Sequence, residues 1–565
     1  MKIEILDSRR LTGPNLFWDW PGAVLDISVC DIPADLVIST WSEEVACLMD
    51  AMGWDGRNIR SRKFDGGASL VINAPIDVLY TACELNEVAL NRTIAWLSNE
   101  SLPDLAQVTA DLNKQLAEER NPALLALQQT ATDHHVPFLW DDDEVSVGFG
   151  NTAIVWQTRQ LPEPESINWP AVGSIPLGIV TGTNGKSTTV RLAAAILAAA
   201  GLRAGITSTD YIRVGKEILD HGDYSGPGGA RTLLRHPQSE AVVLEVARGG
   251  LLRRGIGVER ADGALITNIA ADHLGDYGIN TVAEMAEAKF IVRRALSADA
   301  PLILNADDPE SIRYAHTLSN HVMWFGLNAD EGMLRQHLKS NGGAAFLADG
   351  WLVLAADGET RKIAEVKDIP ITFGGIARYN ISNALGAMAL CHVLGADDQA
   401  LAAGLKAFSG DADINPGRGN LFEQDGIRIF LDFAHNEHGV RAISDTVRAF
   451  HAKRNIVLMG QAGDRLNKDI DDLVRAVCEL KPERLLACEL PGYERGRSPM
   501  EVPARIRDVA TGEGMPEDAV TMFTSPLEGV KDALADATQG DCLVLLALTQ
   551  RDEVLALIRA FVTDD

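Results

Sequence analysis

Residues 182–188 read Gly-Thr-Asn-Gly-Lys-Ser-Thr, a set of residue types suited to holding the phosphates of a nucleotide. The two glycines let the backbone curl so that several N–H groups point at one spot. Lys186 would then reach the β- and γ-phosphates, and the Ser187 hydroxyl would bind Mg²⁺. The strict P-loop pattern requires a glycine where Val180 stands, so only the shorter form of the motif is present. A glycine turn that merely joins a buried strand to a helix is the alternative interpretation.

The segments around this loop indicate what must hold it in place. An apolar run at 175–180 predicts a strand before the loop, and an alanine-rich run at 192–200 predicts a helix after it. That helix adds its positive N-terminal end to the phosphate site. Further apolar runs alternate with helical patterns, and they predict strands at 241–246, 263–268 and 300–304 with a helix at 282–296. This order predicts a parallel sheet covered by helices on both faces.

Chemically capable side chains follow these predicted strands. Glu245 ends one strand, Asp272-His273 follow a second, and an Asn-Ala-Asp-Asp run at 305–308 follows a third. Because the carboxyl ends of parallel strands meet at one edge, ligands of such sheets bind there. Carboxylate and hydroxyl oxygens are the ligands that Mg²⁺ prefers, so Ser187 and Glu245 are candidate metal ligands.

The composition excludes several classes of protein. The net charge is −28, which argues against a nucleic-acid backbone as the main partner. The seven cysteines form no Cys-x-x-Cys pair, so reduced thiols in a cytoplasmic protein are expected rather than a zinc site. No signal peptide and no membrane helix is predicted.

Three domains are expected from changes along the chain. Eight of the ten tryptophans precede residue 170, and a Pro-containing linker follows at 161–167. Helical periodicity at 76–97 and 102–127, with strands at 69–75 and 145–150, predicts a mixed α/β domain over 1–165. The sheet with the glycine loop occupies 172–412. A second parallel sheet, with strands at 427–432, 455–459, 484–488 and 542–546, occupies 413–565.

Four motifs together resemble the Mur ligase superfamily. They are the glycine loop, Thr-Asn-Ile-x-x-Asp-His at 267–273, Asn-Ala-Asp-Asp-Pro at 305–309 and Asp-Phe-Ala-His-Asn at 432–436. These enzymes join a carboxylate to an amine through an acyl phosphate made with ATP. The resemblance implies an α/β fold in which an α+β N-terminal domain precedes a central P-loop sheet domain and a smaller Rossmann-like C-terminal domain.

Further segments resemble cyanophycin synthetase in particular. Residues 222–227 with Arg231, 245–255, 415–422 and 463–465 are similar to its Mur-type half, and 11–16 and 74–80 are similar to its N-terminal domain. Cyanophycin synthetase carries an ATP-grasp domain between these parts, which adds aspartate. Here a short linker takes its place, so this chain is not expected to build cyanophycin alone from aspartate and arginine.

The resemblance implies roles for residues of the central domain. ATP would be bound by Thr183, Asn184, Gly185, Lys186, Ser187 and Thr188. Two Mg²⁺ ions are expected, held by Ser187, Glu245 and His273. Lys289 corresponds to a lysine that CO₂ carbamylates in several Mur ligases, which would convert a cation into an anion able to orient a metal. An ordinary exposed lysine on a helix is the alternative for Lys289.

The resemblance also implies roles for residues closer to the C-terminus. Asn383 and Asn380 would contact adenine, Arg418 the γ-phosphate, and Asp432 the ribose. His435 and Asn436 would lie by the phosphates or the incoming carboxylate. The amine substrate would meet Asp464, Arg465, Arg497 and Glu501, and domain closure would complete the site.

These features predict an ATP-dependent carboxylate–amine ligase with one active site, acting on an amino acid or dipeptide amine. Its partners would be small molecules or short peptides and further copies of itself in a homo-oligomer. Single ligation and polymerisation both remain open. Two alternatives are a Mur-like subunit that amidates a cell-wall precursor, and an inactive nucleotide-binding scaffold. The first usually carries a cysteine zinc insert, whereas the central region has only Cys391.

Overall fold

The computed structural model describes residues 2–54, 56, 58–330 and 332–563. Its contacts divide the chain into two units. The first unit contains Met1–Ile269, Leu274–Trp324 and Ala389–Asp397. The second contains Ala270–His273, Phe325–Met388 and Asp398–Asp565. No described helix combines the length and the apolar character needed to cross a bilayer.

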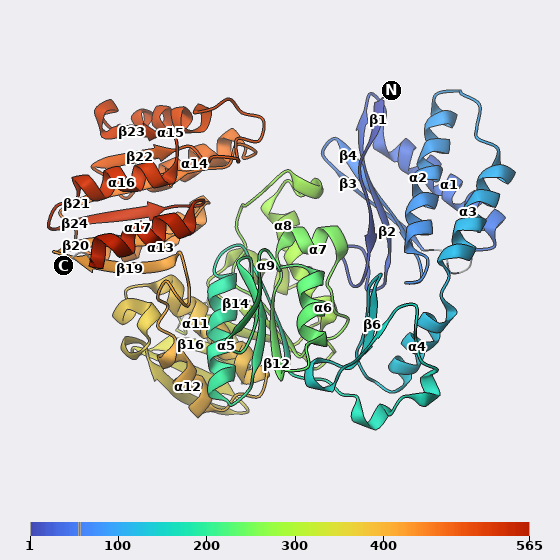
Figure 1. The fold of residues 1–565 in the computed structure, drawn as a ribbon, viewed down its shortest axis with the longest axis horizontal. Coiled ribbons are helices and arrows are strands. Elements are labelled where there is room, and N and C mark those ends of the chain that lie inside the picture. The colour runs from blue at the N-terminus through green and yellow to red at the C-terminus, as the bar shows by residue number, and fades with distance from the viewer. Residues whose placement is uncertain (1, 55, 57, 331, 564–565) are drawn as a thin grey trace. The chain divides into compact units, whose positions relative to one another are not determined.

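The first unit begins with an antiparallel sheet in the order β1-β2-β4-β3. Its strands are β1 (Lys2–Leu11), β2 (Gly22–Cys30), β3 (Ile59–Phe64) and β4 (Gly67–Asn73). Helices α1 (Ala34–Met52), α2 (Leu79–Leu97) and α3 (Leu105–Glu119) lie on one side of it (Figure 1). On α1, Val37, Trp41, Val45 and Leu48 form a buried stripe at helical spacing, which fixes the face that packs on the sheet.

The prediction of one helix over 102–127 is wrong. The chain forms α3 and then a separate helix, α4 (Pro122–Asp133). Proline has no N–H to donate and is tolerated at the first turn of a helix, so Pro122 starts a new helix rather than continuing α3. The Asn121 side chain caps it by accepting from the Leu124 N–H at 3.1 Å. A small antiparallel sheet follows: β5 (Phe138–Trp140), β6 (Glu144–Val147) and β7 (Ile154–Gln157).

The parallel sheet predicted in the central region is confirmed. Its strands are β9 (Ala204–Thr207), β12 (Ala241–Glu245), β8 (Leu177–Thr181), β13 (Gly263–Ile266) and β14 (Leu302–Asn305), in that spatial order. Beyond β9, β10 (Tyr211–Val214) and β11 (Glu217–His221) add an antiparallel edge. The helices of this region are α5 (Lys186–Ala199), α6 (Pro227–Arg235), α7 (Arg248–Arg254), α8 (Val282–Lys289) and α9 (Pro309–Ala315). The single helix predicted over 282–296 is wrong, because α8 ends at Lys289 and a 3₁₀ segment, Phe290–Ala295, follows.

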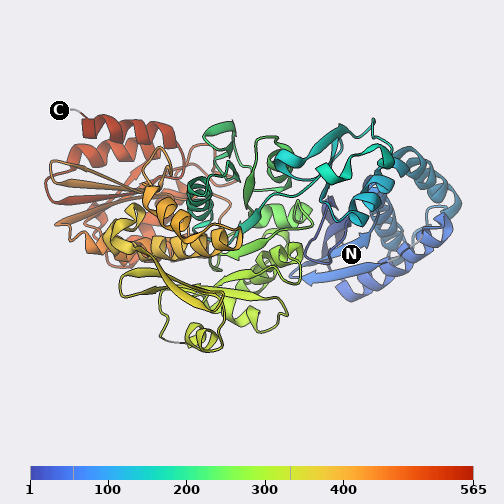
Figure 2. The same cartoon turned by 90° about the horizontal axis from the view of Figure 1, so that it is seen from below.

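Residues 322–407 contain elements that the sequence did not predict. They are β15 (Val322–Gly326), α10 (Gly332–Lys339) and an antiparallel trio, β16 (Ala344–Ala348), β17 (Trp351–Ala356) and β18 (Glu359–Glu365). The trio forms the yellow-green hairpins of Figure 2. Two helices follow, α11 (Arg378–Val393) and α12 (Asp398–Ala407).

The C-terminal sheet has the order β19-β20-β24-β21-β22-β23. All four predicted strands are confirmed, as β20 (Ile427–Asp432), β21 (Arg454–Gly460), β22 (Arg484–Cys488) and β24 (Asp541–Leu546). They run parallel with β23 (Val520–Phe523), whereas β19 (Arg418–Gln424) is an antiparallel edge that the prediction of a purely parallel sheet missed. Its helices are α13 (Glu437–Ala449), α14 (Asn467–Cys478), α15 (Glu501–Gly512), α16 (Pro526–Asp536) and α17 (Arg551–Thr563). Helices α13–α15 contribute to one apolar core of this sheet, and helices α16 and α17 contribute to another. Helices therefore cover both faces of the sheet, which confirms the predicted α/β class.

A buried ion pair joins the N-terminal sheet to α7 within the first unit. Arg9 on β1 contacts Asp26 on β2 at 2.6 Å, and only 8% and 5% of these side chains are exposed. Arg9 also donates to the Leu252 carbonyl from Nε and Nη2, at 3.3 and 3.2 Å. One guanidinium thus neutralises a buried carboxylate and satisfies a carbonyl of another element.

We predict that Arg9→Met destabilises the first unit by ~3–5 kcal/mol, because it leaves the Asp26 carboxylate buried without its counter-ion. Lys63→Met is the matched control in the same sheet, because the Lys63–Asp35 pair is 57% and 77% exposed. Breaking that exposed pair is expected to change the free energy of unfolding by ~0–1 kcal/mol. Urea unfolding measures both variants, and equal effects would contradict a structural role for the buried pair.

Candidate active site

The glycine loop leaves β8 and is held in place by the end of β13. Gly182 has φ +147°, and a Cβ there would overlap the Thr267 hydroxyl, so only glycine fits. The Thr183 N–H donates to the Asn268 carbonyl and the Asn184 N–H to Asn268 Oδ1, both at 2.9 Å. Thr267 Oγ1 donates to the Asn184 carbonyl at 2.7 Å. The loop conformation is therefore fixed by the protein before any ligand binds.

Helix α5 starts directly from this loop. Gly185 is its N-cap residue, in the left-handed region with φ +85°. Lys186 folds back over the loop, and its Nζ donates to the carbonyl oxygens of Gly182 and Thr183 at 3.0 Å each. Ser187 and Thr188, in the first turn of α5, are buried. A lysine and a helix N-terminus at one glycine loop form a site for phosphate groups.

Glu245 lies at the carboxyl end of β12, next to the strand that carries the loop. It pairs with Val180 on β8, and the Thr181 hydroxyl donates to the Val246 carbonyl at 2.8 Å. The Glu245 side chain is 1% exposed. The buried Glu245 carboxylate and the Ser187 hydroxyl in the first turn of α5 are a donor set that fits Mg²⁺. Glu245 thus ends β12, and Ser187 follows the glycine loop that leaves the neighbouring strand β8.

Lys289 is the last residue of α8 and is 3% exposed. The alternative of an ordinary exposed lysine is therefore wrong. Lysine is almost never fully buried without a partner or a modification that removes its charge.

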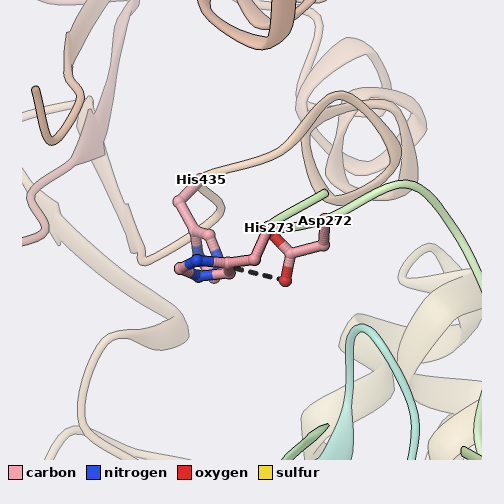
Figure 3. Close-up of side chains that lie close together, drawn as sticks. All are labelled: Asp272, His273 and His435. Atoms are coloured by element: carbon pink, nitrogen blue, oxygen red, sulfur yellow. Dashed lines mark ion pairs between the residues drawn. The ribbon is translucent and has the colours of Figure 1, made fainter. Parts of the chain in front are cut away.

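Asp272, His273 and His435 form a cluster in the second unit (Figure 3). Each offers one potential ligand atom, and these atoms lie within 4.8 Å of one another. His273 takes a left-handed conformation with φ +51°. His435 Nε2 lies 3.9 Å from Asp272 Oδ2, and this is the ion pair drawn in Figure 3. Burial alone would raise the pKa of Asp272, but the hydrogen bond and charge of His435, with His273 and Arg465, hold it well below its usual value.

Arg465 supplies the positive charge of this cluster. Its Nη1 contacts Asp272 Oδ1 at 3.2 Å, and its Nη2 lies 2.6 Å from His273 Nε2. Arg497 in turn donates to the Arg465 carbonyl at 2.7 Å. Because the guanidinium already contacts Asp272 Oδ1 and His273 Nε2, a metal ion would have to displace it to use these two atoms. The role of His273 as a Mg²⁺ ligand stays a prediction.

Arg418 and Asp432 face each other across β19 and β20. Asp432 Oδ1 accepts from the Ala434 N–H at 2.7 Å. Burial raises the pKa of Asp432 to about 6, although Arg418 and the hydrogen bonds from the Ala434 and Gly419 N–H groups act in the opposite direction. The Arg418 guanidinium lies 5.7 Å from the centre of the Phe433 ring, where a cation–π contact orients it.

The two asparagines expected at the adenine differ in their surroundings. Asn380 is fully buried and donates to the Ile371 carbonyl at 3.0 Å, while its Oδ1 accepts from Asn383 Nδ2 at 3.1 Å. The fold thus uses both ends of the Asn380 amide, which leaves Asn383 as the better candidate for contact with a base.

The residues expected at the amine substrate and incoming carboxylate contact one another or the backbone. Asp464 pairs with Arg495, and Arg497 pairs with Glu501 at 3.2 Å. Asn436 caps α13 by accepting from the Gly439 N–H at 2.8 Å. Gln461 donates to the His435 carbonyl at 2.7 Å. These contacts show how the residues are positioned, and their substrate roles stay predictions.

Sequence reasoning missed the residues that hold the site in place. Asn268 lies inside a motif that was recognised, but its contact with the glycine loop depends on strand order. The Arg551 guanidinium lies 4.0 Å from the centre of the Phe433 ring. The two residues are far apart in the sequence, and no local pattern connects them.

Two regions of the chain match known protein families. Residues 180–391 match the Mur ligase middle domain, and residues 417–547 match the Mur ligase glutamate ligase domain. The two matches together cover more than half of the chain. The chain belongs to the Mur ligase superfamily, whose members are ATP-dependent acid–amino acid ligases.

Individual proteins of known name are similar to this chain over part of its length. A cyanophycin synthetase from Synechocystis sp. is 37% identical over 324 residues, which cover 57% of this chain and 37% of that protein. The UDP-N-acetylmuramoyl-L-alanyl-D-glutamate–2,6-diaminopimelate ligase of Geobacter metallireducens is 26% identical over 397 residues, covering 67% and 74%. E. coli FolC, solved with DHPP and ADP, aligns with a TM-score of 0.49 at 19% identity over 68% of this chain and 89% of that one. The matches span less than half the length of the cyanophycin synthetases.

We predict that Asp432→Asn stabilises the second unit near neutral pH. Because the pKa of Asp432 is raised from 3.8 to about 6, the folded state holds this proton more tightly than the unfolded chain. The free energy of unfolding therefore falls as the pH rises through this window and stays reduced above it. Asparagine removes the effect, so the variant gains ~3 kcal/mol at pH 7.5 but only ~1 kcal/mol at pH 4.5.

Calorimetry at the two pH values measures this difference. Asp413→Asn, at an aspartate 79% exposed in the same unit, is the control and is expected to change the unfolding temperature little. An Asp432→Asn variant that is less stable than the wild type at pH 7.5 would contradict the prediction.

Proposed function

We propose that this protein is an ATP-dependent amide ligase with a single active site, which joins a carboxylate to an amino acid or dipeptide amine through an acyl phosphate. The observation that carries the proposal is the pre-formed glycine loop at the carboxyl end of β8, with Lys186 folded over it and Glu245 buried beside it. Membership in the Mur ligase superfamily supports the reaction class.

The chemistry assigns separate tasks to the side chains. A carboxylate needs activation before an amine can form an amide, and transfer of the γ-phosphoryl group supplies the leaving group. Lys186, the loop N–H groups and Arg418 would hold and neutralise the phosphates. Ser187 and Glu245 would hold Mg²⁺, which supplies further charge neutralisation when it is bound. Asn383 and Asp432 would contact adenine and ribose, and closure of the domains would exclude water from the acyl phosphate.

Substrate identity rests on similarity alone. The curated relatives include cyanophycin synthetases, but this chain matches less than half of their length. Only residues 158–176 separate β7 from β8, which leaves no room for a second catalytic domain at that point. One ligation step, on an amino acid or on a ready-made dipeptide that is polymerised, fits this organisation. We further propose that it acts in the cytoplasm as a homo-oligomer.

Phosphate release over a panel of amino acids and β-linked dipeptides, followed by mass spectrometry of the products, tests the proposal. Release is expected only when a carboxylate and an amine are both present. Lys186→Ala should lower turnover about 100-fold or more, because it removes a cation aimed at the transferred phosphoryl group. Lys216→Ala, at an exposed lysine of the β10–β11 turn, is the matched control and should leave turnover unchanged.

ATP turnover indifferent to every carboxylate and amine would overturn the ligase proposal. ATP binding without turnover, together with partner binding that survives Lys186→Ala, would instead identify a scaffold. Release that depends on a cell-wall precursor and an ammonia donor would identify an amidating subunit.

We predict that Lys289 is carbamylated, because it corresponds to a lysine that CO₂ carbamylates in several Mur ligases, it is 3% exposed, and a carbamate reverses its charge. Lys289→Arg keeps the positive charge and cannot be carbamylated, so it should lower kcat about 10–100-fold. In ¹³C-bicarbonate, NMR of the wild type should show a carbamate carbon that Lys289→Arg lacks. Lys339→Arg is the control, because Lys339 also ends its helix but is exposed. A wild-type spectrum without this signal would contradict the prediction.

A further inference from the structure

Tyr379, the second residue of α11, carries a polar group that the fold does not use. Its ring packs on the core of the C-terminal sheet with Phe373 and Phe430. Its hydroxyl oxygen is shielded from solvent and makes no hydrogen bond of good geometry with a described residue, although the Asn380 amide lies close to it. Leaving a buried polar group without a partner costs ~1–3 kcal/mol, and native proteins do so rarely. The hydroxyl therefore needs an explanation outside the packing of the apolar core.

The position of this hydroxyl is fixed by Gly419. Gly419 lies at a bulge in β19 with φ +74°, and a Cβ on it would overlap the Tyr379 hydroxyl oxygen. The Gly419 N–H donates to the carboxylate of Asp432. Burial, and then the nearby charge of Asp432, raise the pKa of Tyr379 well above its usual value, whereas the Asn380 side chain acts in the opposite direction. The phenol and the carboxylate thus meet at one glycine, and all three residues belong to the second unit.

These groups complement a vicinal diol. An ionised carboxylate only accepts hydrogen bonds, and an acidic side chain commonly accepts from the ribose hydroxyl of a bound nucleotide. A hydroxyl that donates to Asp432 still has lone pairs that can accept from a phenol O–H. The backbone N–H groups of Ala434 and Gly419 hold the carboxylate in place without needing the phenol.

We propose that the Tyr379 hydroxyl donates a hydrogen bond to the ribose of the bound nucleotide, next to Asp432, and that it selects ribonucleotides over deoxyribonucleotides. The inference rests on the proposed function only in requiring a nucleotide at this site. Phenylalanine would fill the same space, so the hydroxyl serves recognition rather than packing.

Isothermal titration of the full chain tests this with ADP, 2′-deoxy-ADP and 3′-deoxy-ADP, all with Mg²⁺. Tyr379→Phe is expected to weaken ADP binding about 3- to 10-fold, the loss of one hydrogen bond. In the Tyr379→Phe variant, removing the ribose hydroxyl that Tyr379 contacts should weaken nucleotide binding by a smaller factor than it does in the wild type. The two changes are then coupled, as in a double-mutant cycle. The unfolding temperature should stay the same or rise, since a group without a partner is removed.

Additive effects of Tyr379→Phe with both deoxynucleotides would overturn the inference, as would a fall in unfolding temperature that marks the hydroxyl as structural. Tyr314→Phe is the matched control, because Tyr314 is also half-buried and packs on a phenylalanine, Phe290, at 4.2 Å. It should leave all three affinities unchanged. A wild type that binds none of the three nucleotides would refute the proposed function itself, which is a separate result.

Discussion

The close approach of the ends of β8 and β13 is the constraint on which the candidate site depends. Gly182 leaves no room for a side chain against Thr267, and Asn268 accepts from one N–H group with its carbonyl and from another with its side chain. The phosphate-binding conformation is thereby held by strand order rather than by a ligand. Electrostatic catalysis gains from such pre-organisation, because no dipole has to reorient when charge develops. Glu245 shares this edge because β12 is the other neighbour of β8.

Several polar and charged side chains of the candidate site are buried, at positions where apolar side chains would be more stable. Glu245, Lys289 and Asn380 are all less than one-tenth exposed, and Asp432 has a raised pKa. Buried polar and charged groups lower the stability of the folded state unless partners offset their desolvation. Their positions at strand ends, at the end of α8 and at the start of α11 agree with the general finding that perturbed groups gather at functional sites.

The sequence predicted the parts of the molecule that local patterns encode. Apolar runs located the parallel strands, because a strand buried on both faces is apolar throughout. The glycine loop was recognised from its residue types at fixed spacing. The breaks at Pro122 and after Lys289 were missed because apolar periodicity continues across them. Hairpins β16–β18 were missed because short antiparallel strands give a weak signal within an alternating α/β pattern. Contacts such as Arg465 with His273 join residues about 190 positions apart, which no local pattern can specify.

Arg465 also sets a condition on the chemistry of the Asp272–His273 segment. The Asp272 carboxylate is largely buried and its pKa is held low, so a positive charge must accompany it. In this structure the charge is a guanidinium that reaches both the carboxylate and the imidazole. An imidazole nitrogen uses one lone pair, so His273 Nε2 cannot accept from Arg465 and coordinate a metal at the same time. A metal at His273 Nε2 would therefore have to displace Arg465 and take over its charge. Contact with the guanidinium and metal coordination through Nε2 therefore exclude each other at His273.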